Sequence, residues 1–196
     1  FLDPLFKGSY PKDLLNLYAT RVSDFSFIEK GDMEAMTEPC DFLGINYYNR
    51  SIMEYDSSAV CLFTGAHSDY PKTDMGWDIS PNEFVELIER VRRDYTELPI
   101  YITENGSAWN DELKDGRVDD LGRVDFLEQH LEAVSEMNAR GLNVAGYFCW
   151  SLMDNFEWGH GYSQRFGIVH VDFETQKRTP KASYYRYQEI IKNNKV

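Results

Sequence analysis

The stretch "LPIYITENGSAWN", residues 98–110, decides which fold this chain adopts. An apolar run typical of a buried strand covers 98–105, and it leads into Glu104 and an Asn-Gly break. This glutamate has two interpretations. It is either a solvated strand end before a loop, or a carboxylate held for chemistry at the C-terminal rim of a parallel barrel. The remainder of the sequence has to decide between them.

Two further apolar runs flank this strand in the chain. "CDFLGINYYNR" (40–50) and "NVAGYFCWSL" (143–152) are both predicted as buried strands. Amphipathic patterns between the three runs predict helices over 80–95 and 119–141. Strands that are apolar throughout and alternate with helices are typical of an α/β fold, with a parallel sheet covered by helices.

Local signals mark the ends of the predicted elements. Ser80 is a candidate N-cap with Pro81 in the first turn and Glu83 at capping-box spacing, and Gly141 is a candidate C-cap. The other expected elements are helices within 9–19, 27–36 and 181–194 and hairpins within 51–63 and 166–180.

The chain is expected to form a single unit over 1–196, because no repeat, linker or low-complexity tract interrupts it. Three parallel strands leave both sheet edges open, and a complete (β/α)₈ TIM barrel takes about 250 residues. We therefore expect the C-terminal part of such a barrel, about strands 6 to 8, without its N-terminal half.

Composition excludes several function classes. A net charge of −13 argues against nucleic acid as a partner and makes an anionic substrate less favourable, although a local basic pocket could override the mean. No stretch is long enough to span a membrane. Three cysteines without close spacing favour reduced thiols in the cytoplasm over disulfides, and there is no CxxC metal pattern. We expect no cofactor and no metal.

Polar and aromatic side chains follow all three predicted strands. Singly they are not specific, since a glutamate at a strand end is usually solvated, an NYY triplet usually packs and a tryptophan usually belongs to the core. Three adjacent strands that all end this way favour a functional edge. The side chains are Asn46, Tyr47 and Tyr48, then Glu104 and Asn105, then Trp150, Asp154, Asn155, Glu157 and Trp158.

Four segments carry a resemblance to a known family. They are "DFLGINYY", "TDMGWDISP", "IYITENG" and "GYFCWSLMDNFEWGHGYSQRFGIVHVDFETQKRTPKAS". Together they resemble the C-terminal portion of glycoside hydrolase family 1, the retaining β-glucosidases, and the resemblance extends from "LDPLFKGSYP" to the chain end. It implies a TIM barrel and hydrolysis of terminal β-D-glucosyl residues.

The resemblance also implies roles for single residues. Glu104 matches the family's catalytic nucleophile, Tyr48 the residue that hydrogen-bonds this carboxylate, and Asn46 a residue lining the cleft. The remaining matches concern sugar binding: Trp150 as an aromatic floor (plain core being the alternative), Glu157 and Trp158 as partners of glycone hydroxyls, and Phe166 as a wall.

The same segment narrows the expected substrate. The phospho-glycosidase branch of the family carries a serine in the Glu157–Trp158 stretch, and lysine and tyrosine at positions like Gln164 and Phe166. A carboxylate at Glu157 would repel a sugar phosphate. We therefore expect an unphosphorylated β-glucoside or cello-oligosaccharide, with β-galactosides and β-fucosides left open.

One half of the expected site is not in this sequence. The family's acid/base glutamate lies in an Asn-Glu-Pro motif, which this chain does not contain. Retaining chemistry needs both carboxyl groups. We expect a glycosidase that is inactive without an N-terminal half, with that half or a homo-oligomer as its partner. The alternative is a non-catalytic partial barrel that binds sugars or self-assembles.

Overall fold

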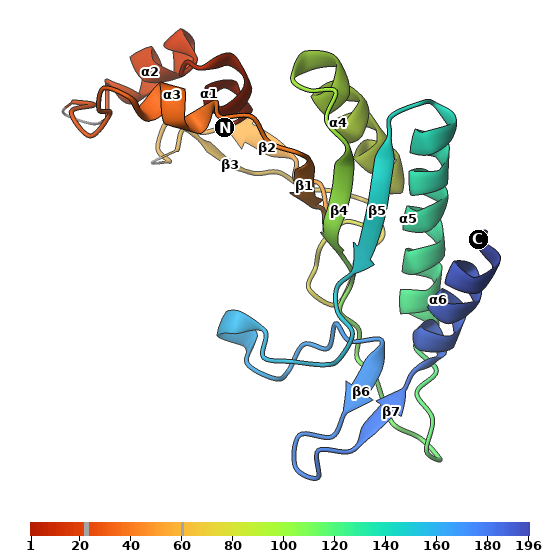
Figure 1. Cartoon of the computed structure of the whole chain (residues 1–196). Coiled ribbons are helices and arrows are strands. Elements are labelled where there is room, and N and C mark those ends of the chain that lie inside the picture. The colour runs from red at the N-terminus through yellow and green to blue at the C-terminus, as the bar shows by residue number, and fades with distance from the viewer. Residues whose placement is uncertain (22–23, 60) are drawn as a thin grey trace.

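The computed structural model of the chain is built around a parallel three-stranded sheet with the strand order β1–β4–β5 (Figure 1). One long helix precedes β4 and another precedes β5, so the predicted α/β alternation is confirmed. The structure describes residues 1–21, 24–59 and 61–196. The sheet and its two helices comprise β1 (Leu43–Asn46), α4 (Pro81–Asp94), β4 (Ile100–Asn105), α5 (Leu121–Ala139) and β5 (Val144–Cys149).

Smaller elements extend this unit. Both predicted hairpins are confirmed as antiparallel pairs, although residue 60 of the first lies outside the described residues. The helix expected within 27–36 forms only over its last turn. These elements are α1 (Leu2–Lys7), α2 (Lys12–Tyr18), α3 (Asp32–Met36), β2 (Met53–Tyr55), β3 (Phe63–Gly65), η1 (Trp158–His160), β6 (Val169–Val171), β7 (Arg178–Pro180) and α6 (Ala182–Asn193).

The hydrophobic core lies between the sheet and α4 and α5, which cover one face of it (Figure 1). Phe84 and Ile88 are one helical turn apart on α4, and both are fully buried. They belong to one cluster with Ile102 of β4 and Met137 of α5. Each such side chain contributes about 1.5–3 kcal/mol by leaving water. This packing fixes the direction of the strands and therefore the position of their ends.

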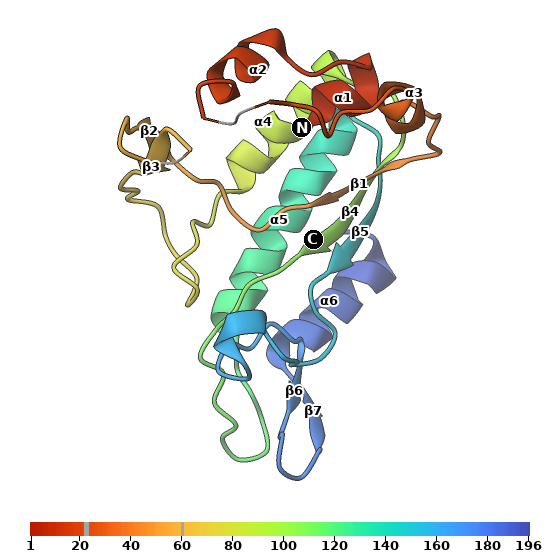
Figure 2. The same cartoon turned by 90° about the vertical axis from the view of Figure 1, so that its left-hand side faces the viewer.

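The opposite face of the sheet is open, and Figure 2 turns it towards the viewer. Phe42 and Phe148 are 53% and 57% exposed, and Thr103 of the central strand is exposed as well. The sequence predicts buried strands, and this burial is confirmed only on the face that α4 and α5 cover. Side chains alternate between the two faces of a strand, and within the described residues no helix or strand covers the second face.

The predicted capping box at the start of α4 does not form. Ser80 is the N-cap residue and Pro81 is the first helical residue, but the Ser80 side chain does not bond to the helix. Its Oγ lies 2.8 Å from the Tyr47 hydroxyl and accepts the Arg50 amide at 3.2 Å, while Glu83 pairs with Arg50 at 2.8 Å. Tertiary partners have replaced the local cap.

The predicted end of α5 is confirmed. The helix has Arg140 as its C-cap, and Gly141 follows directly with a φ of 79°. This left-handed conformation is the one that favours glycine after a helix.

Candidate active site

The candidate site lies at the edge of the sheet where the three parallel strands end (Figure 1). Asn46 is the last residue of β1, and Glu104 is its register partner near the end of β4. Trp150 follows the last residue of β5 directly. The strand topology thus brings together residues that lie about 50 and 100 positions apart in the chain.

Glu104 is held by a hydrogen bond from the neighbouring strand end. The Tyr48 hydroxyl donates to Glu104 Oε2 at 2.6 Å, so the contact that the resemblance implies is present. Burial, and then this hydrogen bond, raise the pKa of Tyr48. The phenol therefore stays protonated and can only donate to the carboxylate. Such a charge-assisted bond fixes the carboxylate orientation as well as stabilising its charge.

Three aromatic rings stand together beside this carboxylate. The ring centroid of Tyr48 lies 5.4 Å from that of Trp77 and 6.1 Å from that of Phe166, and Trp77 and Phe166 are 5.9 Å apart. Phe166 was predicted as a wall residue and is buried here. Trp77 was not predicted, although it stands in the "TDMGWDISP" segment that carries the resemblance, as an aromatic residue among polar ones.

Asn46 and Trp150 lie at the rim of this arrangement. Asn46 is exposed, and its Oδ1 accepts a hydrogen bond of 2.6 Å from the Thr103 hydroxyl. The backbone amide of Trp150 donates to the Asn105 carbonyl at 2.8 Å. Trp150 is partly exposed and is not enclosed in the core.

Glu157 and Trp158 belong to the long loop after β5. Glu157 is the N-cap of η1, and it is partly buried. This burial and the Glu104 carboxylate raise the pKa of Glu157, against an opposing effect of His160. Trp158 is 82% exposed.

Asn105 and Asp154, expected to be polar groups at the functional edge, are structural instead. The Asn105 amide is fully buried, donates to the Tyr47 carbonyl at 2.7 Å and accepts from the Tyr147 hydroxyl at 2.6 Å. Asp154 is buried in a network of ion pairs. Tyr47 likewise turns into the core and stacks on Phe84 at 4.2 Å.

The Asn-Gly sequence after Glu104 is not a tight turn. Neither Asn105 nor Gly106 has a positive φ. A Cβ atom on Gly106 would lie 1.7 Å from the Trp150 carbonyl oxygen. The glycine is required because the ends of β4 and β5 approach each other closely, and so it keeps Trp150 next to Glu104.

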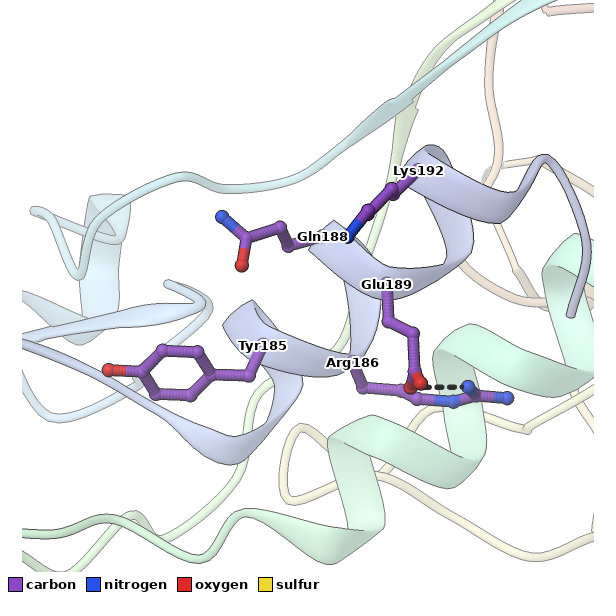
Figure 3. A pocket seen from close by; sticks show the side chains of 5 residues that line it. All are labelled: Tyr185, Arg186, Gln188, Glu189 and Lys192. Atoms are coloured by element: carbon purple, nitrogen blue, oxygen red, sulfur yellow. Dashed lines mark hydrogen bonds and ion pairs between the residues drawn. The ribbon is translucent and has the colours of Figure 1, made fainter.

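A hollow on the surface of α6 is separate from the candidate site. It is lined by side chains of α6 alone, as Figure 3 shows, with Arg186 and Glu189 paired at 2.9 Å. It contains none of the predicted site residues. The other lining residues are Tyr185, Gln188 and Lys192.

In the part of the chain that the structure describes, no group of three His, Cys, Asp or Glu side chains is placed to hold a metal ion. No described helix combines the length and the apolar character that crossing a bilayer requires.

Parallel strands with helices on one face and polar side chains at their C-terminal ends are typical of part of an α/β barrel. The particular family follows from comparison with known proteins. The model for glycosyl hydrolase family 1 matches residues 1–196, and the chain belongs to this family.

This chain spans less than half of the length of the relatives that it matches. β-Glucosidase A of Thermotoga maritima is 42% identical over 99% of this chain, which spans 43% of that protein. The crystal structure of a β-glucosidase from Exiguobacterium marinum is 55% identical with a TM-score of 0.96, over 100% of this chain and 45% of that one. A 6-phospho-β-galactosidase of Leptotrichia buccalis is 38% identical, over 100% of this chain and 47% of its own length.

Proposed function

We propose that this chain carries the nucleophile half of a retaining β-glucosidase, which hydrolyses terminal β-D-glucosyl residues. The observation that carries the proposal is the hydrogen bond from Tyr48 to Glu104 at the C-terminal edge of the sheet. In retaining glycosidases a carboxylate attacks the anomeric carbon and forms a glycosyl-enzyme, which water then hydrolyses. Such a nucleophile has to be charged and fixed in direction, and the Tyr48 bond supports both.

The residues around Glu104 suit a pyranose. Trp150 offers a partly exposed ring on which the C–H face of a sugar can stack, and Phe166 forms a wall behind Tyr48. Asn46 at the rim, together with Glu157 and Trp158 of the following loop, would bond to glycone hydroxyls. Trp158 is exposed in this chain and would need the substrate or a further segment to hold it.

Glu157 decides the substrate class within this proposal. Family similarity alone does not, since a 6-phospho-β-galactosidase is also a relative. The Glu157 carboxylate would repel a phosphate dianion and accept hydrogen bonds from neutral hydroxyls. We therefore infer β-glucosides or cello-oligosaccharides as substrates, with β-galactosides and β-fucosides as further possibilities.

We further propose that an N-terminal half completes the barrel and supplies the acid/base glutamate. The three strands would then correspond to about strands 6 to 8, within one unit over 1–196. The chain spans less than half of its relatives, and its sequence contains no Asn-Glu-Pro. A second copy of the chain is the other partner that could cover the open face. The exposed aromatic rings on this face favour a second candidate function, a non-catalytic module that binds sugars or self-assembles.

The cysteines support a cytoplasmic location for this enzyme. All three are free thiols, and Cys40 and Cys61 are exposed. Exposed thiols persist in a reducing compartment.

A hybrid barrel tests the proposal. The part of the Exiguobacterium marinum enzyme that this chain does not cover would be joined to it, and hydrolysis of an aryl β-glucoside measured. Glu104→Ala should abolish turnover, because no nucleophile remains. Azide should restore it and yield the α-glucosyl azide, since the small anion attacks the anomeric carbon from the vacated side.

The matched control is Glu97→Ala, which alters an exposed glutamate and should keep full activity. Unchanged turnover by Glu104→Ala would remove Glu104 from the mechanism. A folded hybrid that binds glucosides without turning them over would favour the sugar-binding alternative.

A further inference from the structure

The loop after β5 carries part of the proposed sugar site and is closed at its base by backbone hydrogen bonds. Ser151 donates to the Phe166 carbonyl at 3.1 Å, and Ile168 donates back to Ser151 at 2.9 Å. The loop between these points includes Glu157 and Trp158. The placement of both side chains therefore depends on how firmly the base is held.

Asp154 clamps this base with its carboxylate. One oxygen accepts the amide of Gly167 at 3.1 Å, and the other accepts the amide of Val171 at 3.2 Å. Arg165 donates to the same carboxylate at 2.5 Å. Asp154 thus joins the two arms of the loop across 11 to 17 residues of chain.

Lys181 connects this clamp to the loop after β4. Its ammonium group is fully buried, donates to Asp154 at 2.8 Å and also contacts Asp111. Asp111 accepts from Arg123 at 2.7 Å. Arg123 in turn donates to the carbonyls of Arg165 and Ser107, at 2.7 and 3.3 Å.

This ion-pair network contains equal numbers of positive and negative charges and is almost completely buried. It holds three cations and three carboxylates, so removal of one member leaves an uncompensated buried charge, which is strongly destabilising. Burial, and then the nearby Arg123 guanidinium, lower the pKa of Lys181. The members are Arg123, Arg165 and Lys181 with Asp111, Asp120 and Asp154.

We propose that Lys181 is a positioning residue that fixes the loop bearing Glu157 and Phe166 relative to Glu104. This inference rests on the proposed β-glucosidase function. Lys181 lies in the segment that leads into α6, and its ammonium group acts on the sugar indirectly, through Asp154 and Asp111. Its role follows from the linkage of two strand-end loops, because misplacement of a binding group by about 1 Å can cost ~10²-fold in rate.

The first test uses the hybrid barrel with Lys181→Met, which keeps the length of the side chain and removes its charge. We expect kcat/KM for an aryl β-glucoside to fall by about 10²-fold. Arg140→Met, which removes a half-exposed cation at the C-cap of α5, is the control and should change kcat/KM less than about twofold.

A double-mutant cycle separates positioning from mere stability. In a Glu157→Ser background, Lys181→Met should cost less than about tenfold, because the side chain that it places is already gone. If the two losses multiply in full, Lys181 does not act through Glu157 and the inference is overturned.

Hydrogen exchange in the chain gives a readout that does not depend on catalysis. In Lys181→Met the amides of Gly167 and Val171 should exchange faster, while the amides of α4 keep their protection. Unchanged exchange at both amides would contradict the inference. Because this result does not require turnover, a failure of the β-glucosidase proposal would leave it standing and would show separately in the Glu104→Ala hybrid.

A charge-balanced variant covers the case in which Lys181→Met unfolds. Lys181→Met/Asp111→Asn removes one charge of each sign and should fold. We expect it to keep the loss of kcat/KM, because Asp154 still lacks its lysine. Recovery of wild-type kcat/KM by this variant would show that charge balance alone matters and would overturn the positioning role.

Discussion

Tyr47 and Tyr48 are neighbours in the chain, yet they serve opposite faces of the same strand end. Tyr47 is buried, and its hydroxyl donates to the Ser80 carbonyl at 2.8 Å. Tyr48 donates to Glu104 instead. The alternation of side chains along an extended backbone accounts for this division, and only the resemblance indicated which tyrosine would meet the carboxylate.

Glu157 gives a prediction about specificity at the same scale. In the hybrid barrel, Glu157→Ser should weaken β-glucoside turnover, because each lost charge-assisted hydrogen bond is worth about 1.5–3 kcal/mol. Turnover of the 6-phospho-glucoside should rise relative to it, since the repelling carboxylate is absent. Ratios of kcat/KM for the two substrates measure this, and an unchanged ratio would place Glu157 away from the sugar.

His130 gives a prediction about pH. It is fully buried and stacks on Phe126, and its Nδ1 lies 2.8 Å from the Phe126 carbonyl. Among the described residues its Nε2 has no hydrogen-bond partner. Burial lowers the pKa of His130 to about 4, against an ordinary value of 6.5. Below pH 6.5 the histidine is protonated in the unfolded chain but stays neutral in the folded chain. The free energy of unfolding therefore decreases as the pH falls from 6.5 to about 4.

The loss from this group should reach about 3 kcal/mol at pH 4. Urea unfolding at pH 7 and pH 4.5 measures most of it, and the fall should be clearly smaller in His130→Leu. His67→Leu, at an exposed histidine, should behave like the wild type. An equal fall in His130→Leu and the wild type would exclude His130 as the source.

At the scale of elements, the close approach of the β4 and β5 ends predicts the effect of one methyl group. Gly106→Ala should destabilise the fold by more than about 3 kcal/mol, because its Cβ would overlap the Trp150 carbonyl and a backbone atom cannot rotate away. Gly65→Ala is the control, since no atom of the described residues lies within 4 Å of its Cβ position. Thermal unfolding should show a large shift for Gly106→Ala and almost none for Gly65→Ala.

The elements also show what the sequence could predict. Apolar periodicity predicted the two long helices correctly, because the residues on their buried faces lie one turn apart, as Phe84 and Ile88 do. The capping-box prediction was wrong, because the Ser80 hydroxyl hydrogen-bonds to Tyr47 and Arg50, which lie about 30 residues earlier. The bonds of Lys181 to Asp154 and Asp111 could not be predicted either, because pairing over such separations depends on tertiary structure.

At the scale of the whole molecule, the open face dominates. β1 and β5 are the two edges of the sheet in the described part of the chain, so each presents unpaired backbone groups. Phe42 packs on Tyr101 with ring centroids 5.2 Å apart on the open face, and Phe148 is exposed there. Apolar periodicity alone predicted burial for these side chains, since it does not show whether a covering layer is present.

The last prediction concerns the chain by itself. Isolated, it should show no measurable glucosidase activity, because the described residues place no acid beside the proposed nucleophile Glu104 to protonate the leaving oxygen. General acid catalysis contributes roughly 10²–10⁴ in rate.

The chain should also form dimers or larger species, since pairing at the edges and burial of the open face both lower its free energy. Light scattering measures the mass, and Phe148→Lys should reduce association, while Tyr185→Lys on the outer side of α6 should not. Addition of the missing Exiguobacterium marinum segment should convert the self-associated chain into an active complex, because that segment competes for the same face. A compact monomer that hydrolyses glucosides unaided would contradict both parts of this prediction.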